Sequence, residues 1–332
     1  MSRWQPVLVA PAERESDYPG ASRSSGELRT LTVLATGVTL LLVAVGGLVR
    51  ATGSGLGCPG WPKCFGRWVP PLEYHAVIEY SHRFTAFLDV VVIGALALVA
   101  WRRFRQVPRV FRPSVAAFGL VILQALLGGI VVRGELKALL VTAHFATAMI
   151  LVGTLAYAAV GSFTMHAHVG ARVDDLTRLA RAAAASVFAL LVVGAYVRGE
   201  GAGLAFRDWP LMRGRVVPNL SSLRTALHFT HRALALAVGV LLALLIVEAW
   251  RQRTGRPAVA WLCVAAGGLF LAQALVGAAN VWSRLAPAAV VAHVALAGLI
   301  WGLMVAIVAT ARVSGRSRPY VVPRTAPARA TT

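Results

Sequence analysis

The chain alternates long apolar stretches with short polar segments. Each apolar stretch is about 20 residues long, the length that a helix needs to cross a hydrocarbon core of about 30 Å. Backbone polar groups in lipid must find their partners within the spanning segment, so the pattern predicts an all-α integral membrane protein with eight transmembrane helices. The predicted spans are residues 31–49, 76–100, 114–132, 139–163, 179–197, 227–250, 258–280 and 287–311.

Composition agrees with a chain whose main solvent is membrane lipid, because 58% of the residues are hydrophobic and only 14% are charged. The net charge of +20 does not predict a nucleic-acid partner, since the arginines lie at helix ends and in short loops. If the N-terminus is inside, 20 of the 33 Lys and Arg residues lie in inner segments. The positive-inside rule then predicts a multi-pass protein of the plasma membrane with both termini cytoplasmic.

An internal repeat divides the chain into two halves of four spans each. Arginine, Trp-Pro and histidine positions match at a constant offset of 148, which becomes 149 after one inserted residue. Four spans return the chain to its starting side, so we predict two parallel-repeat four-helix bundles related by a pseudo-two-fold axis along the membrane normal. The matches include Arg50 with Arg198, Trp61-Pro62 with Trp209-Pro210, His82 with His231, and His144 with His293.

The repeat predicts five regions along the chain. The polar segment at the N-terminus lacks an apolar core of its own, so it is interpreted as a tail and not as a cleaved signal peptide. The regions are a cytoplasmic tail (1–29), the first half (30–165), a cytoplasmic linker (166–178), the second half (179–311) and a second cytoplasmic tail (312–332).

Four histidines lie at matching depths in the two halves: His82, His144, His231 and His293. Each is about six residues inside its helix, or roughly 9 Å deep, so the two in each half share a level. Neutral imidazole is a common axial ligand of haem iron, and the pattern predicts one haem per half. A single histidine of this kind could instead bond to a neighbouring helix. Zinc or copper is less favoured, because thiols and carboxylates do not converge at ligand spacing in both halves.

The two halves differ where chemistry is expected. Glu79, one helical turn before His82, stands where the second half has His228. A carboxylate at that place can exchange protons or stabilise a developing cation, and the alternative is an ion pair with Arg83. The first half is therefore the predicted place of chemistry.

The first outer loop carries a cysteine pair that has no counterpart in the second half. Cys58 and Cys64 lie on the oxidising side of the membrane, which predicts a disulfide that either ties the loop or exchanges electrons. Arg50 and Arg198 end the first helix of each half at the outer surface. They could hold haem propionates or simply extend to the interface.

Several motifs together resemble the haem A synthase family over roughly residues 30–311. They are the Gly-Gly-Leu-Val-Arg-Ala-Thr-Gly-Ser-Gly run at 46–55, the loop from Cys58 to Cys64, Glu79-x-x-His82-Arg83, Gln124-x-x-x-Gly128-Gly129 and the later histidines. The resemblance implies an eight-helix membrane oxidoreductase of haem biosynthesis and cytochrome oxidase assembly. Such an enzyme converts haem O to haem A by oxidising a ring methyl to a formyl group through successive hydroxylation.

Carried onto this chain, the resemblance makes His82 and His144 the ligands of the substrate haem and Glu79 the catalytic carboxylate. His231 and His293 would hold haem b as an electron-transfer cofactor. It also implies a haem O synthase and an electron donor as partners, and it is compatible with a homo-oligomer. Two rival predictions stay open: a di-haem b electron-transfer cytochrome with equivalent sites, and a parallel-repeat transporter with helices broken at the midplane.

Overall fold

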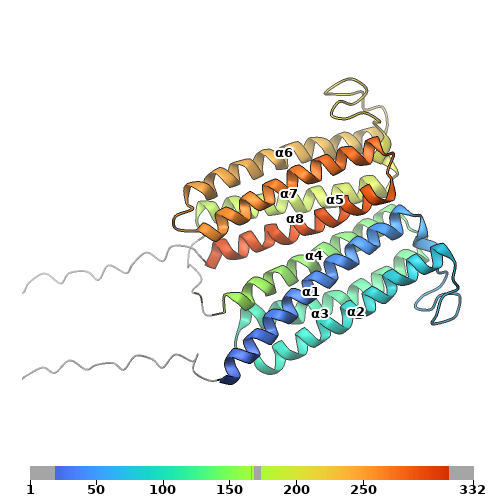
Figure 1. The fold of residues 1–332 in the computed structure, drawn as a ribbon. Coiled ribbons are helices and arrows are strands. Elements are labelled where there is room, and N and C mark those ends of the chain that lie inside the picture. The colour runs from blue at the N-terminus through green and yellow to red at the C-terminus, as the bar shows by residue number, and fades with distance from the viewer. Residues whose placement is uncertain (1–18, 166, 168–172, 314–332) are drawn as a thin grey trace, which may run out of the picture.

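The computed structural model describes residues 19–165, 167 and 173–313, and in these ranges the chain is built from eight long helices without a β-strand (Figure 1). Each helix is long and apolar enough to cross a membrane. The all-α membrane fold with eight spans is therefore confirmed. The helices are α1 (Pro19–Ala51), α2 (Tyr74–Arg103), α3 (Pro108–Arg133), α4 (Ala138–Phe163), α5 (Asp175–Gly199), α6 (Leu223–Arg251), α7 (Pro257–Trp282) and α8 (Pro287–Val313).

Most helices extend beyond the apolar stretches that predicted them. α1 begins at Pro19 rather than at residue 31, and α3 begins at Pro108 rather than at residue 114. Backbone hydrogen bonding continues through polar residues at the interface, and a proline is well tolerated in the first turn. α1 therefore includes part of the predicted N-terminal tail, and α5 begins inside the predicted linker. Residues 1–18, 166, 168–172 and 314–332 of the tails and the linker lie outside the described residues.

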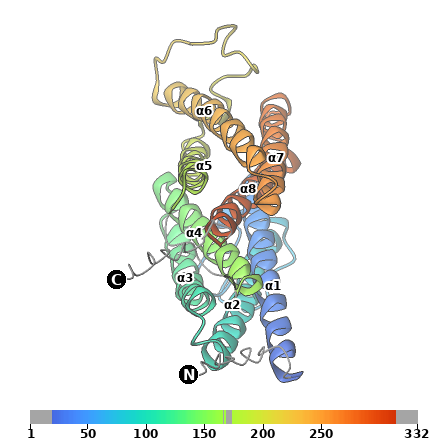
Figure 2. The same ribbon diagram turned by 90° about the vertical axis from the view of Figure 1, so that its left-hand side faces the viewer.

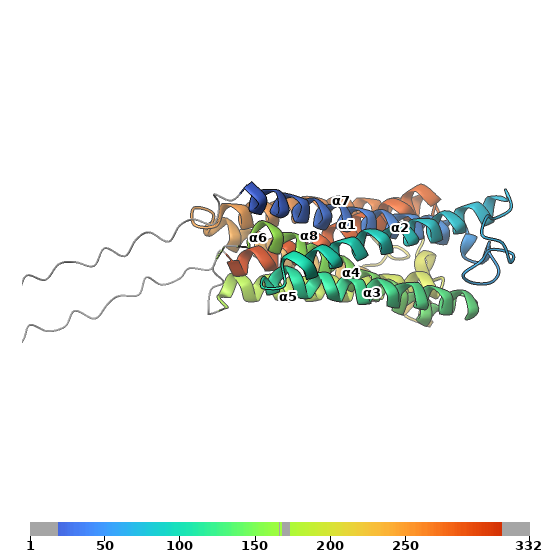
Figure 3. The same cartoon turned by 90° about the horizontal axis from the view of Figure 1, so that it is seen from below.

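Each half forms its own bundle, in which successive helices pack side by side and the fourth returns to the first. The halves meet through α1, α4, α5 and α8, and Figures 2 and 3 show the two bundles lying against each other with their helices along a common direction. α1 contacts α8, α4 contacts α5, and α4 contacts α8. If the two halves exchange places, so that α1 replaces α5 and α4 replaces α8, the same three contacts result. The parallel relation of the repeats stays a prediction, and the contact pattern agrees with it.

Close packing joins α4 to α8 at the centre of this interface. The indole Nε1 of Trp301 donates a hydrogen bond to the backbone oxygen of Met149 at 2.5 Å. A Cβ atom on Gly153 would lie 3.1 Å from the same Nε1. Small residues let helices in lipid approach closely enough for such contacts.

The loops that follow α1 and α5 lie at the same end of the molecule (Figure 1). They also share their local structure. Each begins with a glycine in the left-handed region, Gly53 with φ 69° and Gly201 with φ 65°, which caps a short 3₁₀ turn, η2 (Ser54–Leu56) or η3 (Ala202–Leu204). Cys64 pairs with Arg67 in one loop as Met212 pairs with Arg215 in the other. These loops cover the ends of α2 and α6 that carry His82 and His231.

α5 begins at a charged cap outside the membrane. The Asp174 carboxylate accepts a hydrogen bond from the Thr177 backbone N–H at 3.0 Å and forms an ion pair with Arg256, the residue before α7. Partial burial acts to raise the pKa of Asp174, but the hydrogen bonds from Arg256 and Thr177 outweigh it and lower the pKa to about 2. A depressed folded-state pKa adds stability above the unfolded pKa, and that stability is lost as pH falls toward 2.

Replacing this cap should destabilise the second half. We expect Asp174→Ala to lower the free energy of unfolding by about 1 kcal/mol at neutral pH, because both the cap and the ion pair are lost. Thermal unfolding of the purified protein in detergent measures the change. Asp174→Asn keeps a capping side chain and should lose less. An unchanged unfolding temperature for the alanine variant at neutral pH would show that the cap contributes nothing.

Candidate active site

A cavity of about 2050 Å³ lies between the helices and is lined by residues of both halves. All four predicted histidines line it: His82 from α2, His144 from α4, His231 from α6 and His293 from α8. The structure thus brings the four histidines, which come from four different helices, to the wall of one cavity.

Each of these histidine rings packs against a glycine of the preceding helix. A Cβ atom at Gly46 or Gly194 would approach the ring carbon Cε1 so closely that the ring would have to give way, whereas at Gly128 or Gly277 it would only reach ordinary contact distance. The repeat explains why the same contact occurs four times, and sequence reasoning quoted some of these glycines without assigning them this function. The pairs, with the distance from the Cβ position to Cε1, are Gly46 with His82 (3.2 Å), Gly128 with His144 (3.6 Å), Gly194 with His231 (2.9 Å) and Gly277 with His293 (3.4 Å).

The ring atom Nδ1 of all four histidines is buried without a hydrogen-bond partner among the described residues. A buried polar atom without a partner costs about 1–3 kcal/mol. The alternative in which these Nδ1 atoms bond to neighbouring helices therefore receives no support. Histidines that line a cavity and leave Nδ1 without a protein partner suit metal ligands better than structural histidines.

Two glutamines hold the backbone at the fourth helix of each half. The side-chain Nε2 of Gln124 donates to the backbone oxygen of His144 at 3.1 Å, and Gln273 donates to that of His293 at 3.0 Å. Both glutamines line the cavity and belong to the repeat. They fix the helical turn from which each histidine projects. Sequence reasoning found the glutamines but could not assign this function to them.

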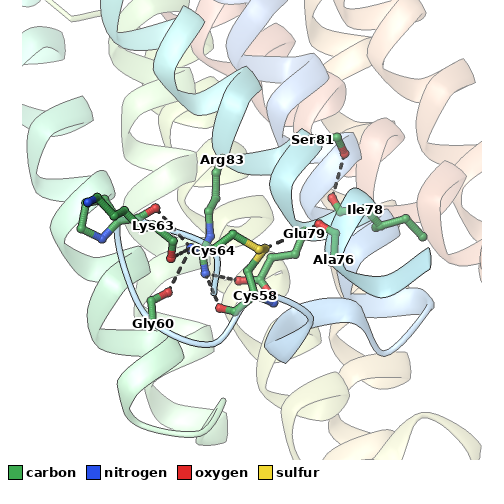
Figure 4. The surroundings of a disulfide bond; sticks show 10 residues. Cys58, Gly60, Lys63, Cys64, Ala76, Ile78, Glu79, Ser81 and Arg83 are labelled. Carbon is green, nitrogen blue, oxygen red and sulfur yellow. Dashed lines mark hydrogen bonds and ion pairs between the residues drawn. A yellow bond between two sulfur atoms is a disulfide. The ribbon is translucent and has the colours of Figure 1, made fainter. Parts of the chain in front are cut away.

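Glu79 is only 3% exposed and joins α2 to the loop that follows α1. Its Oε1 accepts from Arg83 at 2.5 Å, and its Oε2 accepts from the backbone N–H of Cys58 at 2.7 Å (Figure 4). The ion pair that was the alternative for this carboxylate is thus present. Glu79 also lines the cavity, so the ion pair does not remove this residue from the cavity wall.

The second half repeats this arrangement with a histidine in place of the carboxylate. The Nε2 of His228 lies 3.1 Å from the Arg232 Nε, and its Nδ1 lies 3.4 Å from the Phe206 backbone nitrogen; a neutral imidazole accepts a hydrogen bond at one of these two atoms. Arg232 and Phe206 stand at the positions of Arg83 and Cys58. The geometry is therefore shared, and the difference is the negative charge that the first half alone has at this point.

Cys58 and Cys64 form a disulfide, which confirms the predicted pair. Both are buried against Ala76 of α2, and Arg83 donates to the backbone oxygens of Cys58, Gly60, Pro62 and Lys63, as Figure 4 shows for this loop. The disulfide and the guanidinium together shape the loop whose backbone N–H reaches Glu79.

Two arginines lie at the junction between the halves. Arg198 donates to the backbone oxygen of Arg50 at 3.4 Å, and both residues line the cavity. The Nε of each is buried without a hydrogen-bond partner among the described residues, as is the Nη2 of Arg232. Guanidinium groups with free donors beside one cavity fit anionic groups such as carboxylates.

The donor set suits haem. In the described part of the chain, no group of three or more His, Cys, Asp and Glu residues could hold a metal ion. Imidazoles from two helices of each half, an apolar cavity, and guanidinium donors at the ends of α1 and α5 are what axial ligation and propionate binding require. His82 with His144 and His231 with His293 would supply the ligands, and Arg50, Arg198 and Arg232 the donors.

These features define a multi-pass membrane protein with one histidine pair per half around a shared cavity. The chain belongs to the COX15-CtaA family, described as cytochrome oxidase assembly protein, whose model matches residues 29–77 and 72–305. The resemblance drawn from the motifs is thereby confirmed, and the chain is an oxidoreductase of haem A biosynthesis.

Curated relatives cover most of the chain. The chain is 32% identical over 298 residues to a haem A synthase of Alkalihalophilus pseudofirmus, which covers 86% of this chain and 94% of the relative. It is 28% identical over 293 residues to the haem A synthase of Bacillus pumilus, with 83% and 92% covered. The haem A synthase of Bacillus cereus is 30% identical over 267 residues, with 78% and 85% covered.

The glycine contacts predict a graded response to a single methyl group. Gly194→Ala places Cβ 2.9 Å from His231 Cε1, so the ring must move, and we expect haem affinity in the second half to fall about tenfold. Gly277→Ala is the matched control, because its Cβ would meet His293 at an ordinary 3.4 Å. Haem titration of the purified variants measures both. Equal affinities for the two variants would contradict the proposed contact.

Proposed function

We propose that this chain is a haem A synthase that oxidises a ring methyl of haem O to a formyl group by successive hydroxylation. The first half binds haem O through His82 and His144, and the second half binds haem b through His231 and His293. The observation that carries this division is the exchange of Glu79 for His228 within otherwise matching surroundings. The relatives named haem A synthase support the activity.

The oxidation takes the methyl group to an alcohol and then to a gem-diol; with dioxygen as oxidant, each hydroxylation inserts one oxygen atom, consumes two electrons and two protons, and releases one water. The gem-diol then loses water to give the aldehyde. Haem b, when bound, supplies one-electron transfer. Glu79 offers an acceptor at the edge of the cavity, and Arg83 and the Cys58 N–H hold each of its oxygens in place. A carboxylate oriented in this way can accept a hydroxyl proton or stabilise positive charge at the reacting carbon.

The second half lacks a carboxylate at the matching position and keeps a free donor. His228 provides no carboxylate partner for the Arg232 guanidinium, and the Nη2 of Arg232 has no hydrogen-bond partner among the described residues. This arrangement suits a permanently bound haem with an anionic propionate. A di-haem b cytochrome with two equivalent sites would not need the difference. A transporter is disfavoured because the eight helices run through the membrane without a midplane break.

Orientation and partners complete the proposal. The long loops after α1 and α5 lie at one end of the bundle, and the arginine-rich connection between α2 and α3 follows the other end. The positive-inside rule places that connection and both termini in the cytoplasm and the disulfide loop outside the plasma membrane. A haem O synthase would supply the substrate, and an electron donor would reduce haem b.

Pigment analysis tests the division of labour. The purified protein, produced in cells that make haem O, should contain haem b together with haem O or haem A. His231→Ala with His293→Ala should remove haem b, whereas His82→Ala with His144→Ala should remove haem O and haem A, because each pair supplies the axial ligands of one site. Chromatography of the extracted pigments measures both. Haem b alone in the unmutated protein, even with haem O supplied, would contradict the proposal.

A second experiment tests the carboxylate. We expect Glu79→Ala to lower haem A yield by about 100-fold or more, the usual range for a lost acid–base group, while haem O and haem b stay bound. Glu73→Ala is the matched control, since Glu73 is an exposed carboxylate of the same loop that does not line the cavity. An unchanged haem A yield in Glu79→Ala would exclude a catalytic function for this residue.

A further inference from the structure

The first half contains a second carboxyl group inside the membrane, which the proposed chemistry does not use. Asp89 of α2 is 0% exposed and Thr39 of α1 is 1% exposed, yet both side chains line the cavity. The Thr39 hydroxyl lies 2.9 Å from Asp89 Oδ1 and 3.1 Å from Oδ2. Ionisable residues at this depth are costly and are usually retained for a function.

The carboxyl group of Asp89 has hydrogen-bonding capacity left over. Thr39 has one hydroxyl proton, and it also lies 2.8 Å from the backbone oxygen of Ala35. Among the described residues, no basic side chain forms an ion pair with Asp89. A carboxyl group offers about four acceptor sites, and Thr39 is the only described residue that hydrogen-bonds to this one, so most of its sites have no partner among the described residues.

The position of Asp89 relative to His82 places it at the inner edge of a bound haem. Asp89 follows His82 by seven residues, which is two helical turns on the same face and about 10 Å deeper. Arg50 and Arg198 lie at the outer end of the same cavity. A haem held by the histidines, with its propionates at the arginines, presents its opposite edge toward Asp89.

The second half has no such polar pair. Thr39 corresponds to Val187 and Asp89 to Val238 at the repeat offsets of 148 and 149. The inner edge of haem b carries only methyl and vinyl groups, and two valines suit it. Haem O differs from haem b at this edge, because one vinyl group is replaced by a substituent that bears a hydroxyl group and a long isoprenoid chain.

We propose that Asp89, oriented by Thr39, binds the hydroxyl group of haem O and makes the first half prefer haem O over haem b. The inference rests on the proposed function and adds the residues that select its substrate. Asp89 is a specificity residue and not a catalytic one. A purely structural bond between α1 and α2 would stabilise the bundle without changing which haem is bound.

The test uses the full-length chain with His231→Ala and His293→Ala, so that only the first half takes up pigment. The haem-free protein in detergent is titrated separately with haem O and with haem b, and the Soret absorbance gives the ratio of the two dissociation constants. Thr39→Val with Asp89→Val, which copies the second half, should lower the preference for haem O about tenfold or more. The isoprenoid contribution cancels in this comparison. Asp89→Asn, which keeps hydrogen-bonding groups, should retain most of the preference.

A reciprocal change in the second half keeps the inference testable if the first-half variant does not fold. In a chain with His82→Ala and His144→Ala, Val187→Thr with Val238→Asp should raise the preference of the second half for haem O by a similar factor. Unchanged ratios in the valine variant and the reciprocal variant would overturn the inference and leave the proposed function intact. Failure of the parent chain to bind haem O at all would overturn both.

Discussion

A polar group inside a hydrocarbon core costs free energy unless it finds a partner, and this constraint organises the whole molecule. It requires the backbone to form eight helices. It also means that each polar side chain inside the bundle costs free energy and needs a partner or a function. The buried Nδ1 atoms of four histidines and the buried Nε atoms of Arg50 and Arg198 have no hydrogen-bond partner among the described residues, and all six residues line one cavity. The proposed haems would give these residues a metal centre and anionic edges to bind.

The internal repeat supplies two copies of this arrangement, whose sequences have diverged while the local geometry around the site has stayed the same. The backbone geometry of the loops after α1 and α5 is shared, including the capping glycines Gly53 and Gly201. Arg83 and Arg232 contact their own loops in nearly the same way. Within this shared geometry, the first half has Glu79 where the second half has His228. Such a difference changes charge and hydrogen bonding while leaving the helices in place, which suits a division into a reacting half and an electron-carrying half.

The precision of the site depends on small residues and on amides, in addition to the ligands themselves. A glycine beside each histidine ring lets neighbouring helices approach until the ring has little freedom. Gln124 and Gln273 fix the backbone of the helices that carry His144 and His293. Orienting contacts of this kind set the direction of a metal ligand. They follow from packing between helices and occur in both halves.

The sequence by itself determined the eight spans, the two halves, the four histidines and the cysteine pair. These features depend on the length of apolar stretches, on repeat offsets and on residue type, all of which are local or periodic in the chain. The tertiary structure alone decided that Glu79 bonds both Arg83 and the Cys58 N–H, and that Thr39 meets Asp89 from another helix. Such contacts depend on how each helix is rotated and how closely it crosses its neighbours. Hydropathy does not encode that rotation, because lipid and the neighbouring helices are almost equally apolar.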